Sequence, residues 1–195
     1  MANTMATPLG SAVYPKLITP DTKFNPDGVY SCKLIVSEED YNSFRAQLDP
    51  LIEREYNKYL IASGKQKLKR ATEPVRIGED GEYEINAKQT AKTTTKQGDV
   101  LEFKIALYDA DVKPITNEPN IGSGSKMKLS VQPFFWNISA LGFGYTLRLK
   151  AAQIIELVEY ATDSNVFSKE AGGFTQGESF EEVIIEDEVT ETPNF

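Results

Sequence analysis

The residues best suited to chemistry are cations and aromatic rings that cluster between positions 126 and 150. Two stretches of alternating character place basic side chains opposite the apolar ones, at Lys126, Lys128, Arg148 and Lys150. Beside them lie the aromatic residues Phe134, Phe135, Trp136, Phe143 and Tyr145. Cations bind phosphates and aromatic rings stack on nucleobases, so the cluster predicts contact with a single-stranded nucleic acid. Because small barrels also fill their cores with such rings, the basic positions are the stronger part of the signal.

Further basic residues lie upstream, in stretches without acidic residues. The first stretch, Gly64 to Arg70, holds Lys65, Lys67 and Lys69, and a second places lysines among threonines from Lys88 to Lys96. We predict phosphate contacts from the outward cations of these and the later strands, namely Lys88, Lys92, Lys96, Lys104, Lys126, Lys128, Arg148 and Lys150. We predict base stacking by Trp136, Phe143 and Tyr145.

The composition excludes several classes of site. The chain has no histidine and one cysteine, Cys32, which excludes histidine-dependent nucleophilic catalysis, ordinary structural zinc sites and an intrachain disulfide. The segment Gly122–Lys126 lacks the Gly-Lys-Ser/Thr ending of a phosphate loop and precedes a strand, so we interpret it as a flexible loop. Asp109 and Asp111 would need further converging carboxylates to hold Mg²⁺ in a nuclease, and strand alternation does not direct the preceding acids toward them. We expect a non-enzymatic protein without metal or cofactor.

The elements that must position these residues are mainly β-strands around one long helix. Alternation and turn signals predict about six or seven strands from Val13 onward, including 29–36, 74–77, 82–88, 100–108, 126–136 and the region from 145 to 160. The pattern over 151–160 fits strand or helix, and we favour strand. Ser37 is expected to cap a helix with acids in its first turn, which Pro50 either kinks or divides in two.

Charge is distributed unevenly along the chain. The whole chain has 21 basic and 29 acidic residues, a net charge of −8, and seven of the acids lie in residues 178–195, which contain no basic residue. Residues 1–177 therefore carry 21 basic and 22 acidic residues, a net charge of −1. Blocks of like charge are typical of disordered interaction tails. We expect a flexible N-terminus at 1–12, a folded domain at 13–161, a linker at 162–177 and an acidic tail at 178–195.

Several segments resemble phage-encoded single-stranded DNA-binding proteins of the OB-fold, acidic-tail type. The most specific segment is Leu147–Leu157, which reads Leu-Arg-Leu-Lys-Ala-Ala-Gln-Ile-Ile-Glu-Leu, and Gly124–Phe134 is similar as well. Upstream, the matching segments are Tyr14–Leu17, Asp21–Tyr30 and Asp109–Ile115. The resemblance spans nearly the whole chain.

The resemblance implies a Greek-key OB barrel that coats single-stranded DNA during replication and recombination. Arg148 and Lys150 fall on the strand motif of the family. The tail is implied to compete with DNA for the basic groove and to contact the phage DNA polymerase or helicase/primase through Glu186, Asp187, Glu188 and Phe195. Here Thr192–Asn194 separate the acids from the terminal aromatic, whereas in many relatives they are adjacent.

Several properties are expected or stay open at this stage. The chain lacks a signal peptide and a long apolar run, so we expect no membrane association and a location in the cytoplasm of the infected bacterial host. Monomer and homodimer are both compatible with the pattern. The alternative function is a protein-binding adaptor or a minor virion protein, which would bind no oligonucleotide even at low salt.

Overall fold

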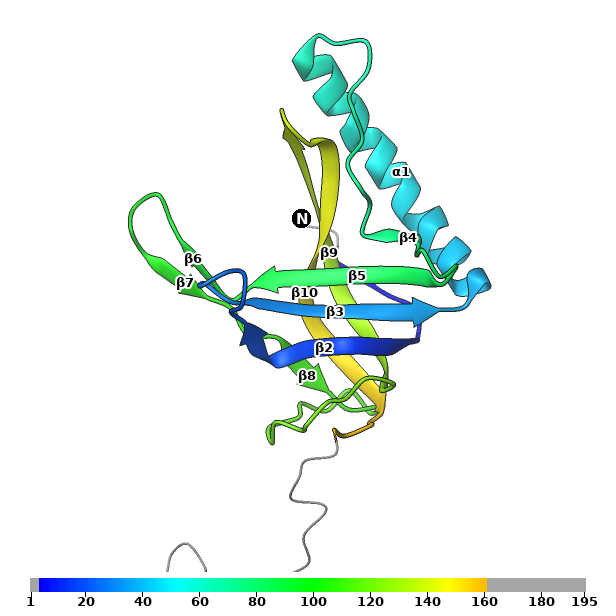
Figure 1. Ribbon diagram of the computed structural model, residues 1–195, viewed down its shortest axis with the longest axis vertical. Helices are drawn as coiled ribbons and strands as arrows, with labels where there is room; N and C mark the ends of the chain where they lie inside the picture. The colour runs from blue at the N-terminus through cyan, green and yellow to red at the C-terminus, as the bar shows by residue number, and fades with distance from the viewer. Residues whose placement is uncertain (1–3, 161–195) are drawn as a thin grey trace, which may run out of the picture. The chain divides into compact units, whose positions relative to one another are not determined.

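The computed structural model describes residues 4–160, and these form a β-rich unit with one helix. Five long strands build its centre: β2 (Gly10–Asp21), β3 (Val29–Val36), β5 (Tyr83–Thr90), β9 (Lys126–Ile138) and β10 (Gly142–Glu156). They pair in the order β2-β3-β5-β10-β9, and β9 pairs again with β2 (Figure 1). The sheet therefore closes on itself as a barrel.

The order of strands around the barrel identifies its topology. Numbered along the chain, the five strands follow one another in space as 1-2-3-5-4-1. Within this ring β5 and β10 run parallel and the other neighbours run antiparallel. A five-stranded Greek-key barrel of this kind is an OB-fold, so the predicted fold class is confirmed.

The barrel core follows from the alternation of the strands. On β9 the side chains of Met127, Leu129 and Val131 are fully buried, and on β10 those of Leu147 and Leu149 are too. Their partners across the interior come from β3 and β5 and include Cys32, Leu34, Ile85 and Ala87. The intervening residues face outward, which is where the predicted cations belong.

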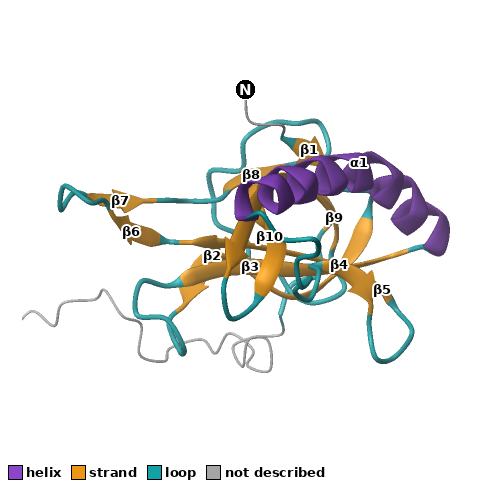
Figure 2. Ribbon diagram, turned by 90° about the horizontal axis from the view of Figure 1, so that it is seen from above, coloured by secondary structure: helices purple, strands orange, loops and turns teal. Residues whose placement is uncertain are grey.

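Helix α1 (Glu38–Ser63) follows β3 directly and packs on one side of the strands, as Figure 2 shows. The Ser37 hydroxyl accepts the N–H of Asp40 at 3.1 Å, and Gly64 ends the helix in the left-handed conformation. Phe44, Leu48 and Ile52 form the buried face of the helix. Pro50 lies inside this single helix, so the chain does not start a second helix there.

Shorter strands complete the unit. The strands β1 (Met5–Ala6), β4 (Val75–Ile77) and β8 (Ala106–Tyr108) pair with β9, β5 and β10 respectively. The strands β6 (Lys92–Thr94) and β7 (Val100–Glu102) form a separate two-stranded hairpin that extends from the end of β5 (Figure 1). None of the residues 4–160 belongs to a helix that is long and apolar enough to cross a membrane.

Two predicted boundaries need correction. Residues 5–6 and 10–12 are strand, because they pair with β9 and β3, and Thr7 between them bonds to Leu129 of β9 through both its backbone N–H and its hydroxyl. The predicted strand 100–108 is two strands in different sheets, and Leu101 is half exposed because β7 belongs to the projecting hairpin. The preference for strand over 151–160 is confirmed as far as Glu156. The predicted linker and tail lie outside the described residues.

Candidate nucleic-acid interface

A continuous row of residues crosses the outer face of the barrel. Lys16 of β2 pairs with Ser31 of β3, Ser31 pairs with Lys88 of β5, Lys88 pairs with Arg148 of β10, and Arg148 pairs with Gln132 of β9. Paired residues point to the same side of a sheet, so these five side chains share one face. We call this set the cationic row: Lys16, Ser31, Lys88, Arg148 and Gln132.

No carboxylate within residues 4–160 forms an ion pair with the cations of this row, Lys16, Lys88 and Arg148. The row crosses four gaps of about 4.8 Å each, so it measures about 19 Å along the curved surface of the barrel. That length matches about five or six nucleotides at ~3.4 Å per stacked nucleotide.

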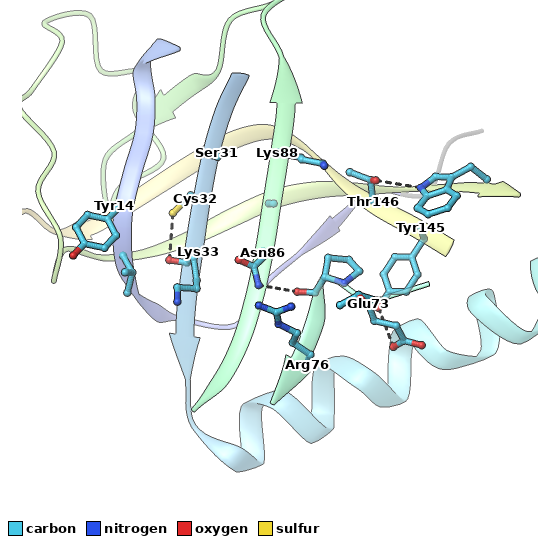
Figure 3. A pocket seen from close by; sticks show the side chains of 15 residues that line it. Tyr14, Ser31, Cys32, Lys33, Glu73, Arg76, Asn86, Lys88, Tyr145 and Thr146 are labelled. Carbon is cyan, nitrogen blue, oxygen red and sulfur yellow. Dashed lines mark hydrogen bonds between the residues drawn. The ribbon is translucent and has the colours of Figure 1, made fainter. Parts of the chain in front are cut away.

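A groove of about 520 Å³ lies beside the cationic row on the same face. Its floor comes from β3 and β5, with Ser31 and Lys33 on the first strand and Asn86 and Lys88 on the second. Tyr14 borders it on the β2 side and Thr146 borders it on the β10 side (Figure 3). Trp136 of β9 also lines it, beside Thr146. The segment that leads into β4 supplies Thr72, Glu73, Pro74 and Arg76 to a third side.

One buried carboxylate organises the cations at the end of the groove that is nearer to α1. Glu84 is 6% exposed and lies 2.9 Å from the Lys33 ammonium and 3.2 Å from the Arg76 guanidinium. The hydrogen bond from Lys33, followed by those from Arg76 and Asn86, holds the pKa of Glu84 below its usual range against the opposing effect of burial. Two cations therefore share one negative charge, which leaves a net positive charge beside the groove.

Aromatic side chains lie beside Arg148 at the β9 edge. The Arg148 guanidinium lies 3.6 Å from the centre of the Phe134 ring, and this ring is 43% exposed. Trp136 donates its indole N–H to the Thr146 hydroxyl at 3.3 Å. A Cβ on Gly144 would lie 2.6 Å from the indole, so only glycine lets the tryptophan lie across β10. Arg148 and Phe134 offer a planar cationic stack of the kind that nucleobases extend.

The opposite edge of the groove holds an aromatic residue that sequence reasoning missed. Tyr14 is 74% exposed and has a positive φ of 46°, which is rare for a residue other than glycine. Its ring projects at the β2 edge in Figure 3. The sequence segment Tyr14–Leu17 resembles the family, but nothing in it reveals this backbone conformation. The cations Lys16, Lys33 and Arg76 and the ring of Phe134 were also not predicted as contacts.

The structure brings together part of the predicted set of cations. Lys88 and Arg148 are neighbours in the cationic row, and Lys150 is exposed two residues further along β10. Lys92 and Lys96 belong to the β6–β7 hairpin, where Lys92 pairs with Glu102 at 2.8 Å, and Lys104 follows that hairpin. Lys126 and Lys128 lie on the other half of β9, in register with Glu156 and Gln153, and the Lys126 ammonium binds the Ser11 hydroxyl.

Two of the three predicted stacking residues are in the core, so that prediction is wrong for them. Phe143 is 2% exposed and packs edge-on against Tyr56 with ring centres 5.3 Å apart. Tyr145 is 3% exposed, and burial raises the pKa of its hydroxyl. Both lie on the inward side of β10, as the alternation with Leu147 already indicated. Trp136 is half-buried and borders the groove.

The remaining candidate motifs have structural roles. Asp109 accepts the backbone N–H groups of Asp111 and Lys113 at 2.9 and 2.8 Å, which shapes a turn. Within residues 4–160 no group of three or more potential metal ligands lies close together. The Gly122–Lys126 segment is hydrogen-bonded to its neighbours, with Ser125 fully buried, and is not the free loop that was expected. The predicted tail residues Glu186, Asp187, Glu188 and Phe195 lie outside the described residues.

The similarity to known proteins extends over the whole barrel. A family model described as single-stranded DNA-binding protein, bacteriophage T7, matches residues 9–157. Among solved structures, gp2.5, the single-stranded DNA-binding protein encoded by bacteriophage T7, has a TM-score of 0.71 at 20% identity, over 90% of this chain and 100% of that chain.

The single-stranded DNA-binding protein from bacteriophage Enc34 also shares the fold. Its C-terminally truncated form has a TM-score of 0.58 at 13% identity, over 80% of this chain and 87% of that chain. The form in complex with single-stranded DNA has a TM-score of 0.57 at 13% identity, over 80% of this chain and 88% of that chain. No curated protein matched the chain. Because the family model covers most of the sequence, this chain belongs to the family of the bacteriophage T7 single-stranded DNA-binding protein.

Proposed function

We propose that this chain binds single-stranded DNA across the outer face of β2, β3, β5, β10 and β9, largely independently of base sequence. The observation that carries the proposal is the cationic row, whose cations have no ion-pair partner within residues 4–160, beside a groove with exposed aromatic rings at its edges. OB-folds bind oligonucleotides on the face of their second and third strands, which here are β3 and β5. The protein acts by binding alone, without catalysis or a cofactor.

The binding free energy has two sources in this arrangement. Lys16, Lys88 and Arg148 neutralise phosphates and release the counterions that these phosphates hold, a contribution that falls as salt rises. Tyr14, Trp136 and Phe134 stack on bases, at about 1–3 kcal/mol per base and without preference among them. No side chain is required to read a base edge, so coating of any single strand follows.

The experiment is fluorescence anisotropy of a labelled oligo-dT with the full chain at about 50 to 200 mM salt. Lys16, Lys88 and Arg148 together with the net positive charge of Lys33 and Arg76 around Glu84 would contact about four phosphates. The logarithm of the association constant should then fall with the logarithm of salt concentration at a slope of about −3, taking about −0.7 per phosphate. An oligonucleotide of mixed sequence should bind within a few-fold of oligo-dT. No binding at the lowest salt would contradict the proposal and favour a protein-binding adaptor.

We further propose that residues 178–195 regulate this interface during phage DNA replication and recombination in the cytoplasm of the infected bacterium. Seven acidic residues and no basic one make this segment a competitor for the cations that bind phosphate. When DNA displaces it, Glu186, Asp187, Glu188 and Phe195 become available to a replication enzyme of the phage, a DNA polymerase or helicase/primase. The support for this step is the charge of the segment and the family to which the chain belongs.

A further inference from the structure

Tyr14 occupies a β-bulge in a conformation that normally requires glycine. Val13 pairs with Lys33 and Lys16 pairs with Ser31, so β2 has two residues, Tyr14 and Pro15, opposite the single residue Cys32. Tyr14 has a φ of 46°, in the left-handed region that side chains other than glycine seldom adopt. The following Pro15 adds to the strain, because a residue before proline favours extended backbone.

The strained conformation is held by a hydrogen bond from outside the strand. The backbone N–H of Tyr14 donates to the Ser123 hydroxyl at 2.9 Å, across 109 positions of sequence. This N–H lies at the bulge, where the pairing of β2 with β3 is interrupted. Ser123 therefore supplies the acceptor that the strand partner does not.

Ser123 is itself fixed, because the turn Gly122–Ser125 is anchored on two sides. Toward β2, Gly124 donates its N–H to the Ala12 carbonyl and Ala12 donates to the Ser125 carbonyl, both at 2.8 Å. Toward the end of the described chain, the Gly122 N–H donates to the Val158 carbonyl at 2.6 Å. The buried Ser125 hydroxyl donates to the Gly122 carbonyl at 2.8 Å and accepts the Val158 N–H at 3.0 Å.

The Tyr14 ring that this arrangement positions is mostly exposed to solvent. Because its side chain is 74% exposed, burial of the ring contributes too little free energy to offset the cost of the strained backbone. Its ring instead borders the groove on the side opposite Thr146 (Figure 3). Bulges recur beside functional sites, where they redirect a side chain.

We propose that Ser123 is a positioning residue that holds Tyr14 ready to stack on a base of single-stranded DNA at the β2 edge of the groove. The inference rests on the proposed function and deepens it, since it assigns one stacking contact and the element that prepares it. Because the backbone that directs the ring toward the groove is already fixed in the free protein, less conformational freedom is lost when DNA binds. The Gly122–Ser125 turn thus serves binding without touching a phosphate.

The test compares four single variants of the full chain for binding to labelled oligo-dT at several salt concentrations. Tyr14→Ala should weaken binding about tenfold, within the range for loss of one stacked base, and Tyr14→Phe should bind like the wild type. Ser123→Ala should weaken binding several-fold. Ser123→Thr keeps the acceptor oxygen and should bind like the wild type. The salt slope should stay unchanged in all four, because no phosphate contact is lost.

The double variant Tyr14→Ala/Ser123→Ala distinguishes positioning from a general structural effect. It should bind no more weakly than Tyr14→Ala alone, since Ser123 acts through the ring. Additive losses, a Ser123→Ala variant that binds like the wild type, or equal losses in Ser123→Ala and Ser123→Thr would overturn the inference. Those outcomes leave DNA binding itself intact, whereas a wild-type chain that does not bind oligo-dT would refute the proposed function.

Discussion

Lys88 and Arg148 are adjacent in register on neighbouring parallel strands and have no carboxylate partner within residues 4–160. Two like charges held this close repel each other, and a phosphate between them removes the repulsion. Arg148 also stacks on Phe134, which fixes the plane of its guanidinium before DNA arrives. These two residues are therefore where the interface should be most sensitive to loss of charge.

Replacing Arg148 by Ala should weaken oligo-dT binding at low salt and make the salt slope shallower by about 0.7, the value for one phosphate of a single strand. Lys88→Ala should act in the same way. The matched control is Lys58→Ala, because Lys58 lies on α1 and pairs with Glu55 at 2.8 Å. A salt slope in Arg148→Ala equal to that of the control would remove Arg148 from the interface.

Glu84 predicts a pH dependence of stability. Its pKa is lowered in the folded state by Lys33 first and by Arg76 and Asn86 next, so its ion pairs stabilise the fold above the pKa of an unfolded glutamate, about 4.3. This stabilisation is lost as pH falls through the lowered pKa. Wild type should therefore exceed Glu84→Gln in free energy of unfolding at about pH 7, and the difference should shrink below about pH 4 in urea titrations. A difference that is constant over this range would mean that the Glu84 charge contributes nothing.

Alternation along the strands contains the orientation of most site residues, and it fails only where the backbone departs from a regular strand. The outward-facing cations Lys88, Arg148 and Lys150 follow the strand period, and the same period should have placed Tyr145 in the core. Tyr14 could not be predicted, because its exposure depends on a bulge and on a hydrogen bond to a residue 109 positions away.

At the scale of elements, the segment after α1 is attached to the start of β10. Phe143 donates its N–H to the Lys69 carbonyl and Ala71 donates to the Phe143 carbonyl, both at 2.8 Å. Gly142 makes this approach feasible, since a Cβ there would lie 2.2 Å from the Lys69 oxygen, and its φ is 90°. The attachment leads into the residues 72–76 that form one side of the groove.

Gly142→Ala should lower the free energy of unfolding by about 2–4 kcal/mol, because it adds a steric clash to an unfavourable φ. Gly98→Ala is the control, because Gly98 has a φ of 94° and a Cβ added there would meet no atom within 4 Å. Its loss should be only about 1 kcal/mol, the cost of the backbone conformation alone. Urea unfolding measures both variants. Equal losses would show that the contact with Lys69 is not maintained in solution.

The elements themselves were largely predictable. Strong alternation located β9 and β10, and the cap at Ser37 located the start of α1. Composition gave a wrong prediction in two places. Much of the small, polar segment 5–12 is strand because it pairs with β9. The apolar Leu101 is half exposed because it lies on the projecting β6–β7 hairpin. In both places the structure depends on which distant strand the segment pairs with, and a local sequence pattern carries no information about that partner.

At the scale of the whole molecule, the net negative charge of the chain repels the phosphates of its proposed ligand, single-stranded DNA. The net charge is −8, but residues 1–177 carry only −1, so most of the repulsion toward DNA comes from residues 178–195. A chain ending at Gly177 should bind oligo-dT several-fold more tightly than the full chain at low salt, with the difference shrinking at higher salt because screening weakens it. Anisotropy titrations of both forms measure this, and weaker binding by the shortened chain would exclude a competing tail.

The central claim is that single-stranded DNA lies across the outer face of β2, β3, β5, β10 and β9, and Trp136 of β9 reports on it directly. It is the only tryptophan of the chain and borders the groove, so its fluorescence comes from the site. We would titrate the full chain with oligo-dT at low salt and follow this emission together with anisotropy of the labelled DNA. The account predicts that tryptophan quenching and anisotropy saturate together, and that added salt reverses both. Binding seen by anisotropy with unchanged Trp136 emission would place the DNA elsewhere and contradict the account.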